Sequence, residues 1–428
     1  MMNAELQDFT DTAVPVERAR LKVWYLTSVE LAVAICVPVF VFGAQLGGGL
    51  PFGRLLLALA ISGLLLSIIG GFSSYVGTAT RLSTALLARA SFGRSGARLI
   101  QFALAFSLFG WFGLQTEVFA RAFIELLHMT GSSWNPSAII VTVIAGLLMS
   151  STSVLGIKGV GRLAIIATPF LLLSLAYALY GSDAAVPVVK PPALAGDRDM
   201  TLGLAIAGIV GAYSVGLVVR PDIQRFAVSK KQGVSSAVLA LGLGYPVLLL
   251  ISAYLSSVTG EPDFTKLLAQ YGFGAFSILM LLLATWTTND MNLYGASLSL
   301  AVLFPALPRW QLTALAGALG TGIACFGLFG HVVALFSFMG VLTTPLLAVY
   351  GAEFLFNRRQ LESPEGRSGI VWPPFIVWAA ASLIGFATTP GGQWGLDLFQ
   401  LTTVPPLDSL IAAGVMMTAL MVLDKKRG

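Results

Sequence analysis

The chain consists of long apolar runs separated by short polar intervals. Each run is about 20 residues long, the length that an α-helix needs to cross a hydrocarbon core of roughly 30 Å. Strands of an outer-membrane barrel would instead alternate apolar and polar positions over segments of about ten residues. The pattern therefore predicts twelve transmembrane helices. The predicted runs are Tyr25–Ala44, Leu55–Val76, Leu99–Leu127, Pro136–Gly156, Leu163–Tyr180, Leu202–Val219, Gly233–Val258, Phe273–Phe304, Leu312–Phe329, Val332–Phe356, Trp372–Thr389 and Pro405–Leu423.

The composition places the chain among all-α integral membrane proteins. Hydrophobic residues make up 56% of it and charged residues 11%, whereas about 25% of the residues of a soluble domain are charged. The first 24 residues are polar and mixed in charge. They lack the features of a cleaved secretory signal, so we expect the first apolar run to stay in the protein.

The distribution of Lys and Arg predicts the orientation, because cytoplasmic loops carry the excess of these residues. Of the 25 Lys and Arg, 20 fall on the side that both termini share and four fall on the other side. We therefore expect residues 1–24 and 424–428 to be cytoplasmic and the protein to lie in the cell inner (plasma) membrane. This asymmetry explains the net charge of +5 without a nucleic-acid partner.

Several function classes lose support because their motifs do not occur in the sequence. The chain has no P-loop, no HExxH, no GxSxG and no regular ladder of arginines, which argues against ATP-driven transport, proteolysis and voltage gating. Its two cysteines form no disulfide or metal pattern. A secondary transporter, a channel and a membrane enzyme without a local signature remain, and the enzyme is the weakest of the three.

Two of the apolar runs contain residues that interrupt helices. Pro38 lies in the middle of the first run and frees carbonyl groups near Ala34. In the sixth run, Gly208, Gly211 and Gly216 flank a short stretch where unwinding costs less. Interruptions at corresponding places in two halves of a chain are typical of transporter binding sites. The alternative is that these glycines serve close helix packing.

Acidic side chains within the apolar runs are candidates for carrying protons, because burial disfavours the ionised form of a carboxyl group. Asp290 ends the polar cluster Trp286-Thr287-Thr288-Asn289-Asp290. Glu117 precedes Arg121 by four residues, which predicts a self-neutralising pair on one helix. Glu30 has no such local partner, and two readings stay open for it: a buried proton carrier or a hydrated side chain near the cytoplasmic interface.

Several segments together resemble the nucleobase:cation symporter-1 family, and within it most closely the bacterial cytosine permeases. The similarity runs from about Arg20 to Arg359. The matching segments are Gly47–Leu50, Leu86–Gly93, Gly110–Gly113, Asp222 with Arg225-Phe226, Trp286–Tyr294 and Asn357–Arg359. The resemblance implies a LeuT-like fold of ten helices in a five-plus-five inverted repeat, with two peripheral helices. The first repeat would cover residues 25–181, the second 201–356, and the peripheral helices 372–423.

The resemblance also implies a substrate site for a flat heterocycle, imported by cation symport with alternating access. Trp111 and Tyr213 match the two aromatic residues that hold the ring, and stacking is worth about 1–3 kcal/mol per base. Asn289 offers both a donor and an acceptor to the ring edge, although it could instead join two helices. Backbone groups at Ala212 and Ser214 would add contacts.

For the coupling ion, the resemblance implies a sodium site formed by the carbonyls of Ala32 and Cys36 and the hydroxyls of Thr287 and Thr288. Proton coupling through Glu30 or Asp290 is the alternative. No other cofactor, metal or obligate protein partner is expected; the partners are a nucleobase-like molecule and the lipid bilayer.

The chain departs from the cytosine permeases at three positions of this site. Ala284 replaces an asparagine, Leu108 replaces a glutamine and Ala212 replaces a serine. The implied pocket is therefore less polar. This favours a purine, hydroxymethylpyrimidine, hydantoin or allantoin as alternatives to cytosine.

Overall fold

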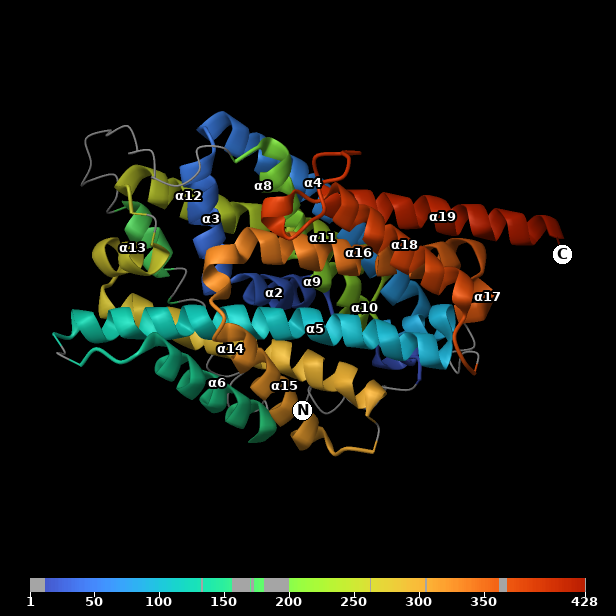
Figure 1. Ribbon diagram of the computed structural model, residues 1–428, viewed down its shortest axis with the longest axis horizontal. Helices are drawn as coiled ribbons and strands as arrows, with labels where there is room; N and C mark the ends of the chain where they lie inside the picture. Colours follow the sequence, from blue (N-terminus) through green and yellow to red (C-terminus); the bar gives the residue numbers. More distant parts are fainter. Residues whose placement is uncertain are drawn as a thin grey trace.

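Helices form the regular structure of the computed structural model, which describes residues 12–131, 134–155, 170, 173–180, 200–261, 263–304, 306–361 and 368–427 (Figure 1). Five of these helices are long and apolar enough to cross a membrane, or six if one bent pair counts as a single span. The principal helices are α2 (Val23–Ala34), α3 (Val37–Gly49), α4 (Phe52–Thr80), α5 (Thr84–Met129), α6 (Ala138–Leu155), α8 (Leu202–Ala212), α9 (Ser214–Val219), α10 (Pro221–Gln224), α11 (Lys230–Ala237), α12 (Tyr245–Thr259), α13 (Phe264–Tyr271), α14 (Ala275–Leu303), α15 (Arg309–Ala324), α16 (Val332–Phe356), α17 (Arg358–Leu361), α18 (Trp372–Thr388) and α19 (Pro405–Arg427).

The first predicted run is divided into α2 and α3, as Pro38 predicted. Cys36 lies between them in an extended conformation, with φ −144° and ψ 157°. Its N–H donates to the carbonyl of Ala34 at 3.0 Å, whereas a continuous helix would direct it to the carbonyl of Ala32. Pro38 lies in the first turn of α3, where its missing N–H costs no helical hydrogen bond. The break therefore releases a backbone carbonyl within the first run.

The sixth predicted run is also broken, and its glycines make the close helix contacts considered above as the alternative. Helices α8 and α9 meet at Tyr213, and α8 is bent by 44° from the segment Ser214–Gln224. A Cβ atom on Gly211 would lie 2.3 Å from the carbonyl oxygen of Phe336. Glycine thus permits direct backbone contact between the end of α8 and the start of α16.

Helix α5 runs along most of the molecule in Figure 1 and packs against α14, α15, α6 and α16. Its first part is the basic stretch that follows Arg81, and a kink at Gly93 separates it from the predicted third run. Gly93 has φ 75° and ψ 171°, a combination that essentially only glycine adopts. The kink therefore divides α5 into a short, largely buried first segment and the long segment that contains the predicted third run.

Most of the remaining predicted runs correspond to helices, although the ninth, Leu312–Phe329, extends beyond α15, which ends at Ala324. A π-helical stretch, Val238–Gly244, joins α11 to α12 within the seventh run. The eighth run corresponds to α14, and α16, α18 and α19 pack together as the tenth to twelfth. Half of the fifth run, Leu163–Tyr180, lies outside the described residues.

The polar segment before α2 forms backbone hydrogen bonds with two loops. Val14 N–H donates to the carbonyl of Arg81 at 3.0 Å, between α4 and α5. Leu21 forms a parallel β-bridge with Ala227, beyond α10. Its N–H donates to the Phe226 carbonyl at 2.9 Å. The start of α2 and both loops therefore lie at the same end of the helices.

Candidate functional site

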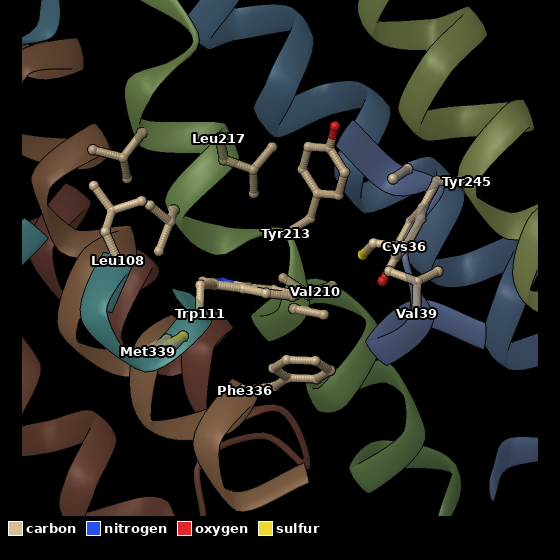
Figure 2. Close-up of a cluster of buried hydrophobic side chains, with 14 of the residues drawn as sticks. Cys36, Val39, Leu108, Trp111, Val210, Tyr213, Leu217, Tyr245, Phe336 and Met339 are labelled. Atoms are coloured by element: carbon tan, nitrogen blue, oxygen red, sulfur yellow. The ribbon is translucent and has the colours of Figure 1, made fainter. Parts of the chain in front are cut away.

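An aromatic wall lies beside the break in the sixth run. Trp111, on α5, is 9% exposed and stacks on Phe336 of α16, with ring centroids 5.0 Å apart and planes 26° apart. Figure 2 shows Tyr213 on the opposite side of Trp111 from Phe336. One face of the indole is therefore covered by a side chain, and the other faces the break.

Tyr213 is held by its hydroxyl group. The Tyr213 hydroxyl donates to two oxygens of Glu30, the backbone carbonyl and the carboxylate Oε2, each at 3.1 Å. Its ring also packs at an angle on that of Tyr245, with centroids 5.2 Å apart. These contacts link the break in the sixth run to α2, the first half of the first run.

Glu30 is buried in an ion pair, so the prediction that it could be hydrated at the interface is wrong. Arg220 Nη1 donates to Glu30 Oε2 at 2.8 Å, and the Arg220 side chain is 0% exposed. Arg220 Nε donates to Ser74 Oγ of α4 at 2.8 Å. The structure thus supplies the acid with a partner that is distant in sequence.

The other side chains labelled around Trp111 and Tyr213 in Figure 2 are mainly apolar. Leu108 and Leu217 lie on the Tyr213 side of Trp111 in Figure 2, and Ala212 is buried at the end of α8. Two of the three departures from the cytosine permeases, Leu108 and Ala212, are therefore buried beside the aromatic wall.

Three polar atoms near the wall are buried and have no hydrogen-bond partner among the described residues: Gln115 Oε1, Ser214 Oγ and Tyr245 Oη. Sequence reasoning proposed Ser214 only through its backbone and missed the other two. Gln115 follows Trp111 by four residues, so the two share a helix face, and this spacing could have identified it. An unpaired buried polar atom costs free energy, and a polar ligand could satisfy it.

Asn289 joins α14 to α5. Its Nδ2 donates to the Phe112 carbonyl at 3.2 Å and to Thr116 Oγ1 at 3.1 Å, and the residue is 0% exposed. Its Oδ1 accepts from Asn292 Nδ2 at 3.4 Å. These are the contacts expected of a residue that joins two helices, and the amide would have to exchange some of them to read a ring edge.

The candidate cation ligands lie on two elements. Ala32 and Cys36 lie at the end of α2 and at the break, and Thr287 and Thr288 lie on α14. Both threonine hydroxyls donate to the Ala284 carbonyl, at 2.8 and 3.0 Å. A donating hydroxyl keeps its oxygen lone pairs, so both oxygens remain able to coordinate a cation.

Asp290 points to a different neighbour from the threonines. Its Oδ1 accepts from Thr152 Oγ1 at 3.2 Å and also from Ser153 Oγ, both on α6. Trp286 Nε1 donates to the same Thr152 hydroxyl at 3.0 Å. The polar cluster of α14 therefore contacts both neighbouring helices: Asp290 binds α6, Trp286 binds Thr152 of α6 and packs on Phe119 of α5, and Asn289 contacts Phe112 and Thr116 of α5 and Met149 of α6.

Glu117 and Arg121 form the predicted pair on α5. Arg121 Nη2 lies 3.0 Å from Glu117 Oε1, and the Arg121 side chain is 54% exposed. Glu117 Oε2 also accepts from the backbone N–H of Phe329 at 2.9 Å. The acid is thus neutralised locally, as the spacing predicted.

Apolar helices, two helix breaks and a buried aromatic wall are the features of a multi-pass membrane transporter. The chain belongs to the permease family for cytosine/purines, uracil, thiamine and allantoin, whose model matches residues 13–394. This confirms the predicted nucleobase:cation symporter-1 membership and excludes the membrane enzyme. The cytosine permease of Escherichia coli K12 is 31% identical over 362 residues, which cover 83% of each chain.

Two solved structures of Mhp1 share the fold. The inward-facing conformation has a TM-score of 0.82 at 21% identity and covers 97% of this chain and 94% of its own. A closed conformation with bromovinylhydantoin bound, described as a nucleobase-cation-symport-1 family transporter, has a TM-score of 0.78 at 20% identity. It covers 99% of this chain and 96% of its own. These similarities confirm the predicted LeuT-like, all-helical fold in its general form.

Proposed function

We propose that this protein is a secondary active transporter that imports cytosine or a related nucleobase by cation symport with alternating access. The observation that carries the proposal is the aromatic wall: Phe336 covers one face of Trp111, and the other face is directed to Tyr213 at a helix break. A planar ring stacks on such a face without regard to its substituents. The family and the cytosine permease from E. coli support this class of substrate.

The proposed architecture has twelve spans, of which the first ten form two inverted repeats. The breaks support this, because they fall in the first and sixth predicted runs, the first helix of each half. Both termini are proposed to be cytoplasmic in the plasma membrane. The contacts of the segment before α2 with the loops at Arg81 and Ala227 support a common side for these three segments.

Within the site, Trp111 and Tyr213 would hold the ring, and Asn289 would contact its edge together with backbone groups at Ala212 and Ser214. Gln115 and Tyr245 join the candidates, because each has a buried polar atom with no partner among the described residues. Leu108 would shape the pocket. The substitution of apolar for polar groups keeps open a purine, hydroxymethylpyrimidine, hydantoin or allantoin as the substrate.

Sodium is the proposed coupling ion. The break turns the Cys36 N–H away from the Ala32 carbonyl, and the Thr287 and Thr288 hydroxyls keep free lone pairs, so uncharged oxygens are available at both elements. A further structural neighbour, a Na⁺-coupled sialic acid symporter, has a TM-score of 0.66 at 12% identity. Proton coupling through Asp290 is the alternative, since its Oδ2 is buried without a partner among the described residues.

The experiment is thermal unfolding of the purified protein with cytosine, uracil, hypoxanthine, hydroxymethylpyrimidine, thiamine, allantoin and a benzyl-substituted hydantoin. Each ring is tested with sodium or choline at two pH values. A ligand that binds only the folded protein raises the unfolding temperature by mass action. We expect one ring to stabilise the protein, and to do so more in sodium.

The outcomes separate the alternatives. Stabilisation by cytosine in sodium supports the first proposal, and stabilisation by another ring shifts the substrate to that ring. An effect that follows pH and ignores sodium supports proton coupling. In proteoliposomes, uptake that saturates and accumulates the ring against its gradient excludes a channel. No stabilisation by any ring would overturn the proposal.

A further inference from the structure

A buried chain of polar side chains connects the two broken runs. Glu30 on α2 and Arg220 after α9 are 190 positions apart in sequence, yet their charged groups are 2.8 Å apart. Arg220 also donates to Ser74 on α4. Three separate segments therefore meet at one guanidinium group, close to both helix breaks.

This chain ends at an aromatic residue of the ring site. The hydroxyl of Tyr213 donates both to the carboxylate oxygen that Arg220 binds and to the backbone carbonyl of Glu30. The single O–H, shared between these two acceptors at the far end of the phenol, fixes the direction of its ring. Phenylalanine at this position could stack equally well, but nothing would fix its orientation.

We propose that Glu30 and Arg220 are positioning residues of the ring site: they orient Tyr213 and clamp α2 to the end of α9. The inference rests on the proposed function, because Tyr213 must contact the bound ring. It also gives Glu30 a different role from proton carriage. Its carboxylate Oε2 accepts from Arg220 Nη1 at 2.8 Å and from the Tyr213 hydroxyl at 3.1 Å. Glu30 therefore holds Arg220 and Tyr213 together through one carboxylate oxygen.

The test compares Tyr213→Phe, which removes the hydroxyl and keeps the ring, with Glu30→Gln, which removes the charge and keeps an oxygen acceptor. Affinity is measured on the purified full-length protein with radiolabelled cytosine, or with the ring of the panel above that stabilises it most. Tyr213→Phe should weaken binding about two- to tenfold, the range of one lost hydrogen bond, and Glu30→Gln should weaken it by no more than that, because an acceptor remains while the charge that Arg220 binds is lost. Because both act through the same contact, the double variant should be no weaker than the weaker single variant.

Two further measurements distinguish positioning from other roles. The pH dependence of uptake should be the same in Glu30→Gln as in the native protein. Arg220→Lys, which keeps the charge but not the planar donor geometry, gives a second route to the same contact if Glu30→Gln does not fold, and it should also be non-additive with Tyr213→Phe. Arg121→Ala is the matched control: it breaks a pair on α5 and should leave affinity unchanged.

Failure of the inference is distinguishable from failure of the proposed site. Additive losses in the double variant would overturn the inference. So would a flattened pH profile with native affinity in Glu30→Gln, because that result identifies a proton carrier. If Trp111→Leu loses binding while Tyr213→Phe and Glu30→Gln keep it, the inference alone is wrong. If all three bind as the native protein does, the ring site itself is wrong.

Discussion

The pairs Glu30–Arg220 and Glu117–Arg121 both place opposite charges within the helices, but they join different things. Glu117 and Arg121 are neighbours on one continuous helix, and half of the arginine is exposed. Glu30 and Arg220 connect two separate helix segments and are both buried. An exposed pair is worth about 0–1 kcal/mol, whereas the loss of one partner of a buried pair costs about 3–5 kcal/mol. The Glu117–Arg121 pair therefore lies within one helix, whereas the Glu30–Arg220 pair holds two helix segments together.

The largest expected effect is on folding stability, from Glu30→Ala. This change leaves Arg220 buried without its carboxylate, and we expect the free energy of unfolding to fall by about 3–5 kcal/mol. Thermal or denaturant unfolding of the purified protein measures it. A loss below about 1 kcal/mol would remove the contrast between the two pairs.

The next largest effect is expected on ligand affinity, from a change at Trp111 of α5. Trp111→Ala removes the indole face, and stacking of about 1–3 kcal/mol corresponds to a loss of affinity of about 5- to 150-fold. Since the change also opens a cavity beside Phe336, Trp111→Leu is the companion variant that preserves more volume. Unchanged affinity in a folded Trp111→Leu protein would place the ring elsewhere.

A smaller effect is expected at the proposed cation site on α14. Thr288→Ala removes one oxygen ligand, and the apparent sodium affinity should fall by about two- to tenfold, the range of one lost hydrogen bond. Affinity for the ring at saturating sodium should change less. Sodium titrations of ring binding measure both, with Thr285→Ala on the same helix as the control. Intact sodium dependence in Thr288→Ala would contradict this assignment.

The smallest effect is expected for Arg121→Ala, at the exposed pair. Its loss should lower the free energy of unfolding by no more than about 1 kcal/mol, because about half of the Arg121 side chain is exposed and the Phe329 N–H still binds the other carboxylate oxygen of the buried Glu117. The same unfolding assay applies. A loss as large as that of Glu30→Ala would mean that exposure does not distinguish the two pairs.

The sequence predicted the helices and their breaks because those features are local. The runs near 20 residues, Pro38 and the glycines around Tyr213 each act within a few turns of chain. The Glu117–Arg121 pair was predictable for the same reason, since four residues are one turn.

The contacts that complete the site were not predictable from local pattern. Glu30 meets Arg220, and Trp111 meets Phe336, across more than 180 positions. Single-sequence periodicity describes the exposed and buried faces of a helix, but it does not say which other helix covers them. Asn289 shows the same limit: its position in the polar cluster was evident, whereas its bonds to Phe112 and Thr116 depend on how α14 packs against α5.

The contact between Gly211 and Phe336 limits the size of the ring that the proposed substrate site can accept. The main chain of α8 touches the main chain of α16 at this point, with no room for even a methyl group. The ring of Phe336, and through it the indole that it supports, is therefore set at a distance determined by two backbones. This distance is difficult to change, because it depends on a contact between two backbones. A change in the size of the ring that the proposed site accepts would be obtained more readily at Leu108 and Leu217, on the other side of Trp111, whose side chains no hydrogen bond fixes, than on the Phe336 side.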